Sequence, residues 1–254
     1  MPTATAHYAN LLARHYTWML NLSFDEKVTE QRTILSPILK DTPRGPAVDL
    51  GAGPGFQSLA LAQLGFSPIL ALDTSPELLT ELESALLTHT TSDNIHTHQA
   101  DILNLANHVQ PATAAAIVCM GDTLTHLPDH ESVRHLFSAA ATALAPGGLF
   151  VLTWRDLTIE LKDTDRFIPV RSDSDKIMTC FLEYTSPTTV QVHDLVYTRD
   201  PNHDPAKWTV EKSSFPKLRL SPAWVTQELT AAGLAAQSTA TAGRLSLTVA
   251  QKPL

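Results

Sequence analysis

A short apolar run followed at once by closely spaced glycines is the feature that most constrains the fold. Residues 47–50, Ala-Val-Asp-Leu, are typical of a buried strand, and residues 57–64 have helical periodicity. Between them lie Gly51, Gly53 and Gly55. Glycine lets the backbone approach a ligand closely and adopt positive φ angles. The free N–H groups at the start of the following helix favour an electron-rich ligand. The sequence therefore predicts a ligand site at a strand, loop and helix.

The spacing of the glycines separates two kinds of nucleotide-binding loop. A dinucleotide fingerprint, G-x-G-x-x-G, requires a glycine at position 56, which is Phe56. The loop is instead G-x-G-x-G, with Asp49 two residues before the first glycine. It resembles the first motif of class I S-adenosylmethionine-dependent methyltransferases, where the loop wraps the methionine end of the cofactor. The alternative is an ordinary strand-to-helix turn. The resemblance implies a cofactor loop made of Asp49, Gly51, Ala52, Gly53 and Gly55.

Two further acids follow expected strands. Asp73 ends the apolar run 68–73, about 20 residues after the glycines, where an acid can accept hydrogen bonds from ribose hydroxyls. The same stretch also suits a helix cap before residues 77–87. In the methyltransferase family, an acid after the third strand takes the adenine amino group, and the next residue donates its backbone N–H. Beyond the loop, the resemblance assigns to the cofactor Asp73, Thr74, Asp101, Ile102 and Met120.

Apolar runs alternate with helical patterns through the first part of the chain, which favours a parallel sheet. Strands are expected at 47–50, 68–73, 95–103, 114–120 and 149–154. A helix over 222–234 and strands at 236–240 and 245–250 close the sheet. The prediction is an α/β fold. It is a doubly wound, seven-stranded, mostly parallel sheet with a small antiparallel β insertion after the fifth strand.

The pattern changes after the fifth strand, where period-two runs replace helical periodicity. These runs, at 176–184, 189–199 and 208–220, predict an antiparallel meander. Similar insertions cover the substrate in several small-molecule N-methyltransferases, so the resemblance implies that role here. We expect a single domain with four segments: an N-terminal helical lid (1–44), a cofactor-binding core (45–156), a substrate-cap insertion (157–220) and a C-terminal helix with closing strands (221–254).

The N-terminal segment carries aromatic side chains within two expected helices over 7–40. Tyr16 and Trp18 are candidates to fold over the cofactor, because sites often lie beneath mobile covers. The alternative for both side chains is core packing.

The loop after the fourth strand is the expected place for reacting groups, because ligands bind at the carboxyl ends of strands in open α/β sheets. Asp122 and His126 lie there as candidate catalytic residues and proton acceptors, the alternative being caps or surface polar groups. Strand alternation directs about half of the insertion's side chains to solvent. The candidate substrate contacts are Trp154, Arg155, Tyr184 and Tyr197.

Composition excludes several classes of protein. The 254 residues are 43% hydrophobic and 17% charged, which indicates a globular chain. The net charge of −8 and scattered basic residues argue against nucleic acid. His96 and His98 share a strand face without a third ligand, and the two cysteines lack metal spacing, so no metal is expected. No secretory signal or membrane-length apolar stretch is found, so we expect a cytoplasmic protein without a membrane partner.

These features favour transfer of a methyl group from S-adenosylmethionine to a small-molecule acceptor, with S-adenosylhomocysteine as the other product. An amine is favoured over a carbon atom as the acceptor. In such an in-line displacement, alignment of the reactants contributes roughly 7–11 kcal/mol. The alternatives are a nicotinamide- or flavin-dependent oxidoreductase, which shares an acid at the Asp73 position, and a non-catalytic S-adenosylmethionine-binding protein. An RNA methyltransferase would need a basic surface. The sequence is compatible with a monomer or a homodimer.

Overall fold

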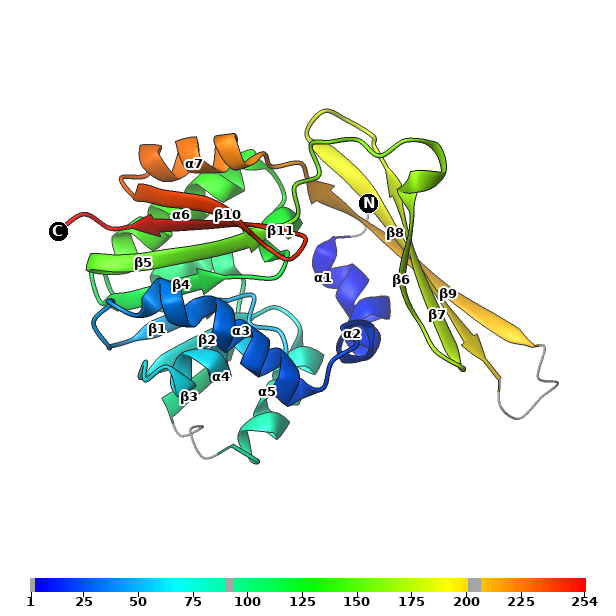
Figure 1. The fold of residues 1–254 in the computed structure, drawn as a ribbon, viewed down its shortest axis with the longest axis horizontal. Coiled ribbons are helices and arrows are strands. Elements are labelled where there is room, and N and C mark those ends of the chain that lie inside the picture. The colour runs from blue at the N-terminus through cyan, green and yellow to red at the C-terminus, as the bar shows by residue number, and fades with distance from the viewer. Residues whose placement is uncertain (1–2, 90–93, 201–206) are drawn as a thin grey trace.

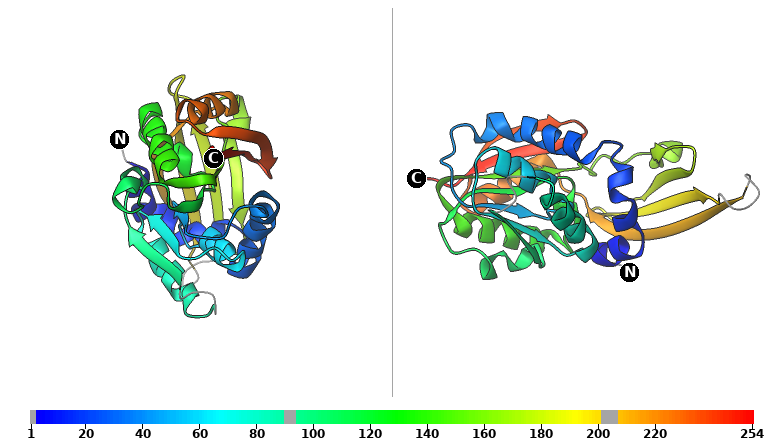
Figure 2. Two further views of the ribbon diagram at one scale, coloured as in Figure 1. Left: turned by 90° about the vertical axis from the view of Figure 1, so that its left-hand side faces the viewer. Right: turned by 90° about the horizontal axis from the view of Figure 1, so that it is seen from below.

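The computed structural model describes residues 3–89, 94–200 and 207–254. A large α/β body carries a seven-stranded sheet, and a four-stranded antiparallel sheet projects from one side of it (Figure 1). The N-terminal helices lie between the body and the small sheet in Figure 1, and the views in Figure 2 agree with this placement.

The large sheet has the strand order β10-β11-β5-β4-β1-β2-β3. Strands β1 to β5 run parallel, β11 pairs antiparallel with β5, and β10 pairs antiparallel with β11. This order confirms the predicted seven-stranded, mostly parallel sheet. The strands are β1 (Ala47–Leu50), β2 (Ile69–Asp73), β3 (Ile95–Gln99), β4 (Ala114–Cys119), β5 (Leu144–Trp154), β10 (Ala235–Ala242) and β11 (Leu245–Gln251).

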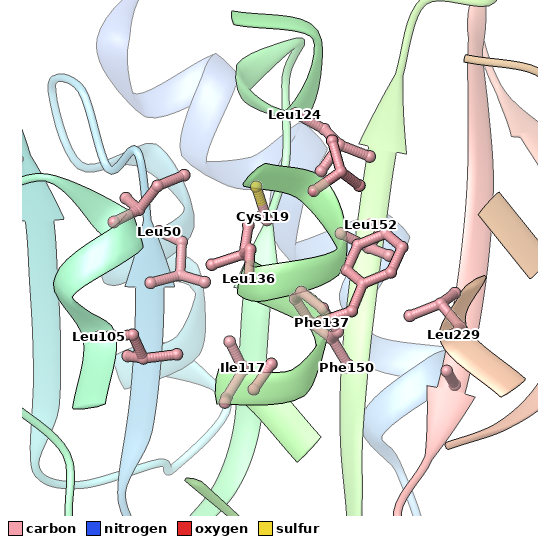
Figure 3. Close-up of a cluster of buried hydrophobic side chains, with 14 of the residues drawn as sticks. Leu50, Leu105, Ile117, Cys119, Leu124, Leu136, Phe137, Phe150, Leu152 and Leu229 are labelled. Carbon is pink, nitrogen blue, oxygen red and sulfur yellow. The ribbon is translucent and has the colours of Figure 1, made fainter. Parts of the chain in front are cut away.

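Helices cover both faces of the large sheet, because its central strands are apolar on both faces. One apolar core contains Phe137 of α6 and Leu229 of α7, packed with Ile117 and Phe150 (Figure 3). A second core on the other face contains side chains of α3, α4 and α5. The helices are α3 (Phe24–Leu39), α4 (Phe56–Gln63), α5 (Pro76–Leu86), α6 (His130–Ala143) and α7 (Pro222–Ala231).

The boundaries of β3 and β5 differ from the sequence expectation, whereas α3 begins at one of its expected caps. β3 ends at Gln99, because the Asp101 side chain accepts a hydrogen bond from Leu103 N at 2.9 Å and caps the 3₁₀ segment Ile102–Asn107. β5 begins at Leu144 because Leu144 already pairs with Ala114 ahead of a register shift. α3 begins after Ser23, which forms a capping box with Glu26.

The small sheet lies between β5 and α7 in the sequence and has the order β6-β7-β8-β9. Its strands are β6 (Phe167–Ser172), β7 (Lys176–Glu183), β8 (Thr189–Arg199) and β9 (Trp208–Leu218). The insertion is therefore antiparallel, as predicted. The sequence prediction missed β6, which is short and contains Pro169, a residue that is depleted in strands.

The N-terminal segment joins the body to the small sheet. It comprises α1 (Ala4–His7), a π-helical turn (Tyr8–Leu12), a 3₁₀ turn (Ala13–His15) and α2 (Tyr16–Met19). Leu11 and Leu12 pack with Met178 of β7 and Val196 of β8 in a small buried cluster. Burial of these side chains holds the segment against the inner face of the small sheet.

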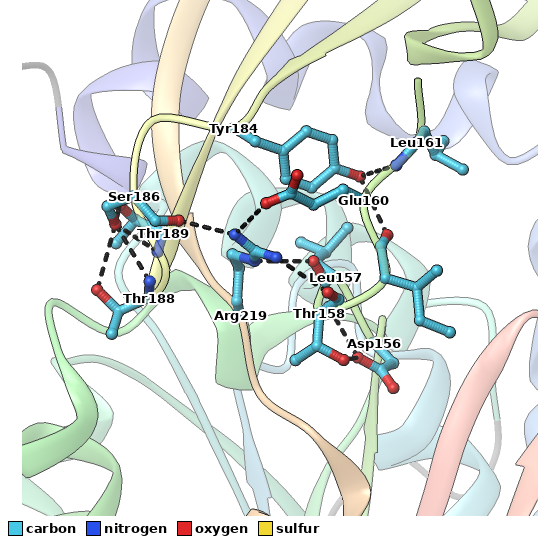
Figure 4. A network of polar contacts seen from close by, with 11 residues as sticks. Asp156, Leu157, Thr158, Glu160, Leu161, Tyr184, Ser186, Thr188, Thr189 and Arg219 are labelled. Atoms are coloured by element: carbon cyan, nitrogen blue, oxygen red, sulfur yellow. Dashed lines mark hydrogen bonds and ion pairs between the residues drawn. The ribbon is translucent and has the colours of Figure 1, made fainter.

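The Arg219 guanidinium fixes the other junction between the two sheets (Figure 4). It donates to the carbonyl oxygens of Ser186 at 2.8 Å, Thr158 at 2.9 Å and Leu157 at 3.2 Å. The Tyr184 hydroxyl accepts from Leu161 N at 3.1 Å in the same region. These contacts tie the segment after β5 to the β7–β8 turn and to the end of β9.

Gly148→Ala tests the close packing of β4 and β5. A Cβ at Gly148 would lie 2.9 Å from Ala145 O and 3.0 Å from Ala114 O, so the backbone must shift. We expect the free energy of unfolding to fall by about 1–3 kcal/mol, measured by urea denaturation. Gly45→Ala is the matched control, because its Cβ would make an ordinary 3.5 Å contact with Ala115 Cβ. Equal stability of the two variants would contradict this account of the packing.

Candidate active site

Two adjoining cavity compartments lie where the loops after β1, β2 and β4 meet the N-terminal segment. The smaller compartment has a volume of about 270 Å³ and the larger about 640 Å³. Both are at the carboxyl ends of parallel strands, where ligands bind in open α/β sheets. The residues that line both compartments are Tyr8, Tyr16, Gly51, Thr123 and His126.

The Asp73 carboxylate organises the wall of the smaller compartment. Gly53 N–H donates to Asp73 Oδ2 at 2.8 Å, and Ser75 N–H donates to Asp73 Oδ1 at 2.8 Å. Gly53 needs its glycine, because its φ of 53° is rarely adopted by other residues. Burial raises the pKa of Asp73, although the backbone hydrogen bonds oppose that shift. The result is an acceptor group fixed beside the glycine loop.

Most of the expected cofactor residues are brought together around this group. Thr74, Asp101 and Ile102 line the smaller compartment together with Gly53 and Asp73. Ala52 and Met120 line the larger compartment on the other side of the loop. Tyr16 closes both compartments, and burial raises the pKa of its hydroxyl to about 12, so the phenol stays neutral.

Two residues of the glycine motif lie beneath the loop and away from both compartments. The Ser58 hydroxyl donates to Asp49 Oδ2 at 2.7 Å, and burial raises the pKa of Asp49 to about 7. Gly55 has a φ of 93° and lies directly against Leu82 of α5, where a Cβ would collide. The structure therefore places Asp49 and Gly55 as supports of the loop.

Asp122 lies in the larger compartment and is engaged in several contacts. It forms an ion pair with Lys217 of β9 and accepts from Arg155 N at 2.9 Å and from Thr125 Oγ1 at 3.0 Å. Burial raises the pKa of Asp122, but the positive charges of Lys217 and Arg155 outweigh burial and hold the pKa below its usual value. Asp122 is therefore a stable carboxylate and a weak proton acceptor, which argues against it as the general base.

His126 forms part of the wall between the compartments. Its ring centroid is 5.7 Å from that of Tyr8 and 5.4 Å from that of Phe215. Burial, reinforced by the charge of Lys217, lowers the pKa of His126 to about 3. The imidazole is neutral near pH 7 and retains a nitrogen lone pair that can accept a hydrogen bond.

The structure contains a buried histidine–aspartate pair that the sequence did not predict. His7 Nε2 lies 3.0 Å from Asp194 Oδ2, with the two side chains 0% and 7% exposed. Asp194 lines the larger compartment, whereas His7 lies behind it, stacked on Phe215 at 4.1 Å. The sequence signal that could have indicated Asp194 is its place in β8, where an acid alternates with the buried Val192 and Val196.

Lys217 was also missed, because a single lysine in an alternating strand carries no motif. It lies in the larger compartment and places its ammonium 5.4 Å from the centre of the Phe215 ring. Arg155, which was expected at the substrate, does line this compartment.

Four expected side chains do not line either compartment. Trp18 donates from Nε1 to Asp173 Oδ2 at 2.6 Å, so it joins α2 to the β6–β7 turn. Trp154 is fully buried and donates to Leu220 O at 2.8 Å, so it is a core residue. Tyr184 belongs to the Arg219 junction in Figure 4, and Tyr197 points to the other face of β8, since it alternates with inward Val196. None of these four side chains is placed to contact a ligand in either compartment.

Within the described ranges, no group of three or more His, Cys, Asp or Glu side chains is arranged to hold a metal ion. No helix in the same part of the chain is both long enough and apolar enough to span a membrane.

Comparison with known proteins identifies the central part of the chain. Residues 47–148 match a family model described as "Methyltransferase domain". Trans-aconitate 2-methyltransferase of Rhizobium meliloti (strain 1021) is 31% identical over 133 residues, which are 52% of this chain and 46% of that protein. Glycine/sarcosine N-methyltransferase of Aphanothece halophytica is 24% identical over 160 residues, which are 62% of this chain and 58% of that protein. The chain thus spans about half the length of the curated relatives it matches.

Solved structures extend the similarity in fold to nearly the whole chain. The CcbJ methyltransferase from Streptomyces caelestis has a TM-score of 0.78 at 16% identity, with 98% of each chain covered. DesVI from Streptomyces venezuelae has a TM-score of 0.73 at 17% identity, covering 96% of this chain and 97% of that one. Together with the family match, these findings confirm the resemblance drawn from the glycine loop. Residues 47–148 therefore match a methyltransferase domain, and nearly the whole chain shares the fold of these solved methyltransferases.

Lys217→Met tests the ion pair in the larger compartment. Removing the ammonium leaves the largely buried Asp122 carboxylate without its ion-pair partner, so we expect a loss of about 3–5 kcal/mol of stability by urea denaturation. Lys40→Met is the control, since Lys40 and Asp41 form an exposed pair that contributes about 1 kcal/mol or less. The double variant Lys217→Met with Asp122→Asn should recover part of the loss. A loss as small as that of the control would contradict the buried pair.

Proposed function

We propose that this protein transfers a methyl group from S-adenosylmethionine to a small molecule, and that the methylated group is an amine. The observation that carries the proposal is the meeting of two compartments at Tyr8, Tyr16 and His126. One compartment has the glycine loop and acids expected of a nucleoside site. The other has polar groups set in an apolar wall, as a substrate site requires.

The chemistry of the smaller compartment fits the cofactor. Asp73 would accept hydrogen bonds from the ribose hydroxyls, and Asp101 with Ile102 would hold the adenine ring. Gly51 lets the loop pack closely against Thr123, because a Cβ at Gly51 would lie 2.4 Å from Thr123 Cγ2. When bound, S-adenosylmethionine supplies a methyl group activated by the positive sulfonium. The protein's part is to align the acceptor and exclude water.

The larger compartment supports an amine acceptor. The carboxylates of Asp122 and Asp194 both line it, and an amine that enters as an ammonium ion is attracted to carboxylates. The neutral imidazole of His126 adds a hydrogen-bond acceptor at the boundary of the two compartments. An acceptor with a hydroxyl group would need a stronger base to become a nucleophile.

The alternatives have less support. A nicotinamide or flavin oxidoreductase shares an acid at the position of Asp73, but its loop needs a glycine at position 56. This chain has Phe56 there, and its ring centroid lies 5.1 Å from that of Phe24. A protein that only binds S-adenosylmethionine has no need of a second compartment of about 640 Å³. A small-molecule acceptor is the partner we propose, because a net charge of −8 does not favour nucleic acid.

Asp73→Asn tests the cofactor assignment. The substitution removes the charged acceptor of the ribose hydroxyls, so we expect affinity for S-adenosylmethionine to fall by about tenfold to a hundredfold. Isothermal titration calorimetry measures the change. Asp129→Asn is the control, since Asp129 caps α6 outside both compartments and should bind as the wild type does. Unchanged affinity in Asp73→Asn would remove Asp73 from the cofactor site.

A further inference from the structure

Three carboxylates line the larger compartment, and one of them, Glu30, is paired with Lys27 at 2.7 Å. Asp122 is neutralised by Lys217 and also accepts two further hydrogen bonds. Among the described residues, the only ionisable nitrogen within ion-pair distance of Asp194 is His7 Nε2, and it contacts Oδ2. The Cys180 thiol on the neighbouring strand is a second polar neighbour. Asp194 is therefore the carboxylate whose charge is not matched by a lysine or arginine.

We propose that Asp194, oriented by His7, binds the ammonium group of the methyl acceptor and takes its proton. This inference rests on the methyl transfer proposed above. It assigns the catalytic acid–base role to Asp194, which neither the motif analysis nor the similar proteins indicated. His7 is a positioning residue, because it lies behind Asp194 and does not line the compartment.

The geometry of His7 supports this role. Its ring is fully buried, stacks on Phe215 with an interplanar angle of 22°, and directs Nε2 at the carboxylate. Its Nδ1 has no hydrogen-bond partner within the described part of the chain, and a buried unpaired nitrogen costs free energy. The contact with Asp194 is thus the one polar contact made by this ring. The other titratable or charged side chains near this pair come from neighbouring elements and are Tyr8, His126, Arg155, Cys180 and Lys217.

The proposed step balances in protons and electrons. The N–H bond of the ammonium breaks, and the proton passes to the Asp194 carboxylate, which leaves a lone pair on nitrogen. That lone pair forms the new N–C bond while the C–S bond of the sulfonium breaks. Sulfur keeps the electron pair of the broken bond and becomes a neutral thioether. Asp194 then releases its proton to solvent as the product leaves.

The surroundings of Asp194 define the class of acceptor. The wall near it is aliphatic and aromatic, and the volume of about 640 Å³ falls within the range of about 300–1,000 Å³ that is typical of ligand pockets. The acceptor is therefore an amine on an apolar body, with the amine at Asp194. The apolar lining includes Leu12, Met178, Leu182, Val192 and Phe215.

Three probes with one apolar body test the recognition step. These are 2-phenylethylamine, 2-phenylethanol and 3-phenylpropionate, each titrated by calorimetry into protein saturated with S-adenosylhomocysteine. We expect the wild type to prefer the amine. Asp194→Asn should weaken amine binding by at least about tenfold and leave the alcohol unaffected, because only the ammonium loses a charged partner. Asparagine is isosteric and keeps an oxygen that accepts from His7 Nε2–H.

Glu183→Gln is the matched control. Glu183 Oε2 also lies 3.0 Å from a histidine, His193 Nε2, but this pair is 53% and 34% exposed and does not line the compartments. It should bind all three probes as the wild type does.

The pH profile separates proton transfer from a structural role. With 2-phenylethylamine as acceptor, release of S-adenosylhomocysteine by Asp194→Asn should rise about tenfold per pH unit below the amine pKa, because only the free amine then reacts. The wild type should show a shallower rise. His7→Gln, whose amide can still donate to Asp194, should retain more activity than His7→Phe. Parallel profiles for the wild type and Asp194→Asn would overturn the proton-accepting role.

The outcomes distinguish this inference from the function on which it rests. If the wild type binds neither S-adenosylmethionine nor S-adenosylhomocysteine, the proposed function fails. If S-adenosylhomocysteine binds but the amine binds equally to the wild type and Asp194→Asn, only the role of Asp194 fails. A preference for 3-phenylpropionate, or no binding of any probe by the saturated protein, would also overturn the proposed acceptor class.

Discussion

The contact between Asp73 and the glycine loop is the interaction on which the site depends. One carboxylate accepts the Gly53 N–H from the loop after β1 and the Ser75 N–H at the start of α5. It therefore joins the ends of two adjacent parallel strands at the edge of the sheet where a ligand binds. The Asp49–Ser58 hydrogen bond and the packing of Gly55 on Leu82 support the loop from below. The smaller compartment is in this way shaped by the backbone.

The second constraint is the position of the N-terminal segment. Leu11 and Leu12 bury their side chains against the small sheet, and Tyr8 and Tyr16 contribute walls to both compartments. The boundary between the two compartments is therefore built from a segment far in sequence from both β8 and β9. Figure 1 shows this segment between the two sheets.

The core could be predicted from sequence because its signals are local. Apolar strand runs, the glycine spacing and the acids at strand ends are each contained within a few residues, and the seven-stranded sheet followed from them. The larger compartment could not be predicted in this way. His7 meets Asp194 across 187 positions and Lys217 meets Asp122 across 95, and no local pattern encodes such pairs. Trp18 and Trp154 are expected at the site from their places in the sequence, but their indole N–H groups find partners elsewhere.

Calorimetric titration of the wild-type protein with S-adenosylmethionine and, separately, with NADH tests the central claim most directly. The account predicts saturable binding of S-adenosylmethionine and no heat of binding with NADH, because the loop lacks the third glycine of a dinucleotide site. Saturable binding of NADH without a response to S-adenosylmethionine would contradict it. In that case the Asp73 site would belong to a nicotinamide enzyme, and the larger compartment would hold the substrate of an oxidoreductase.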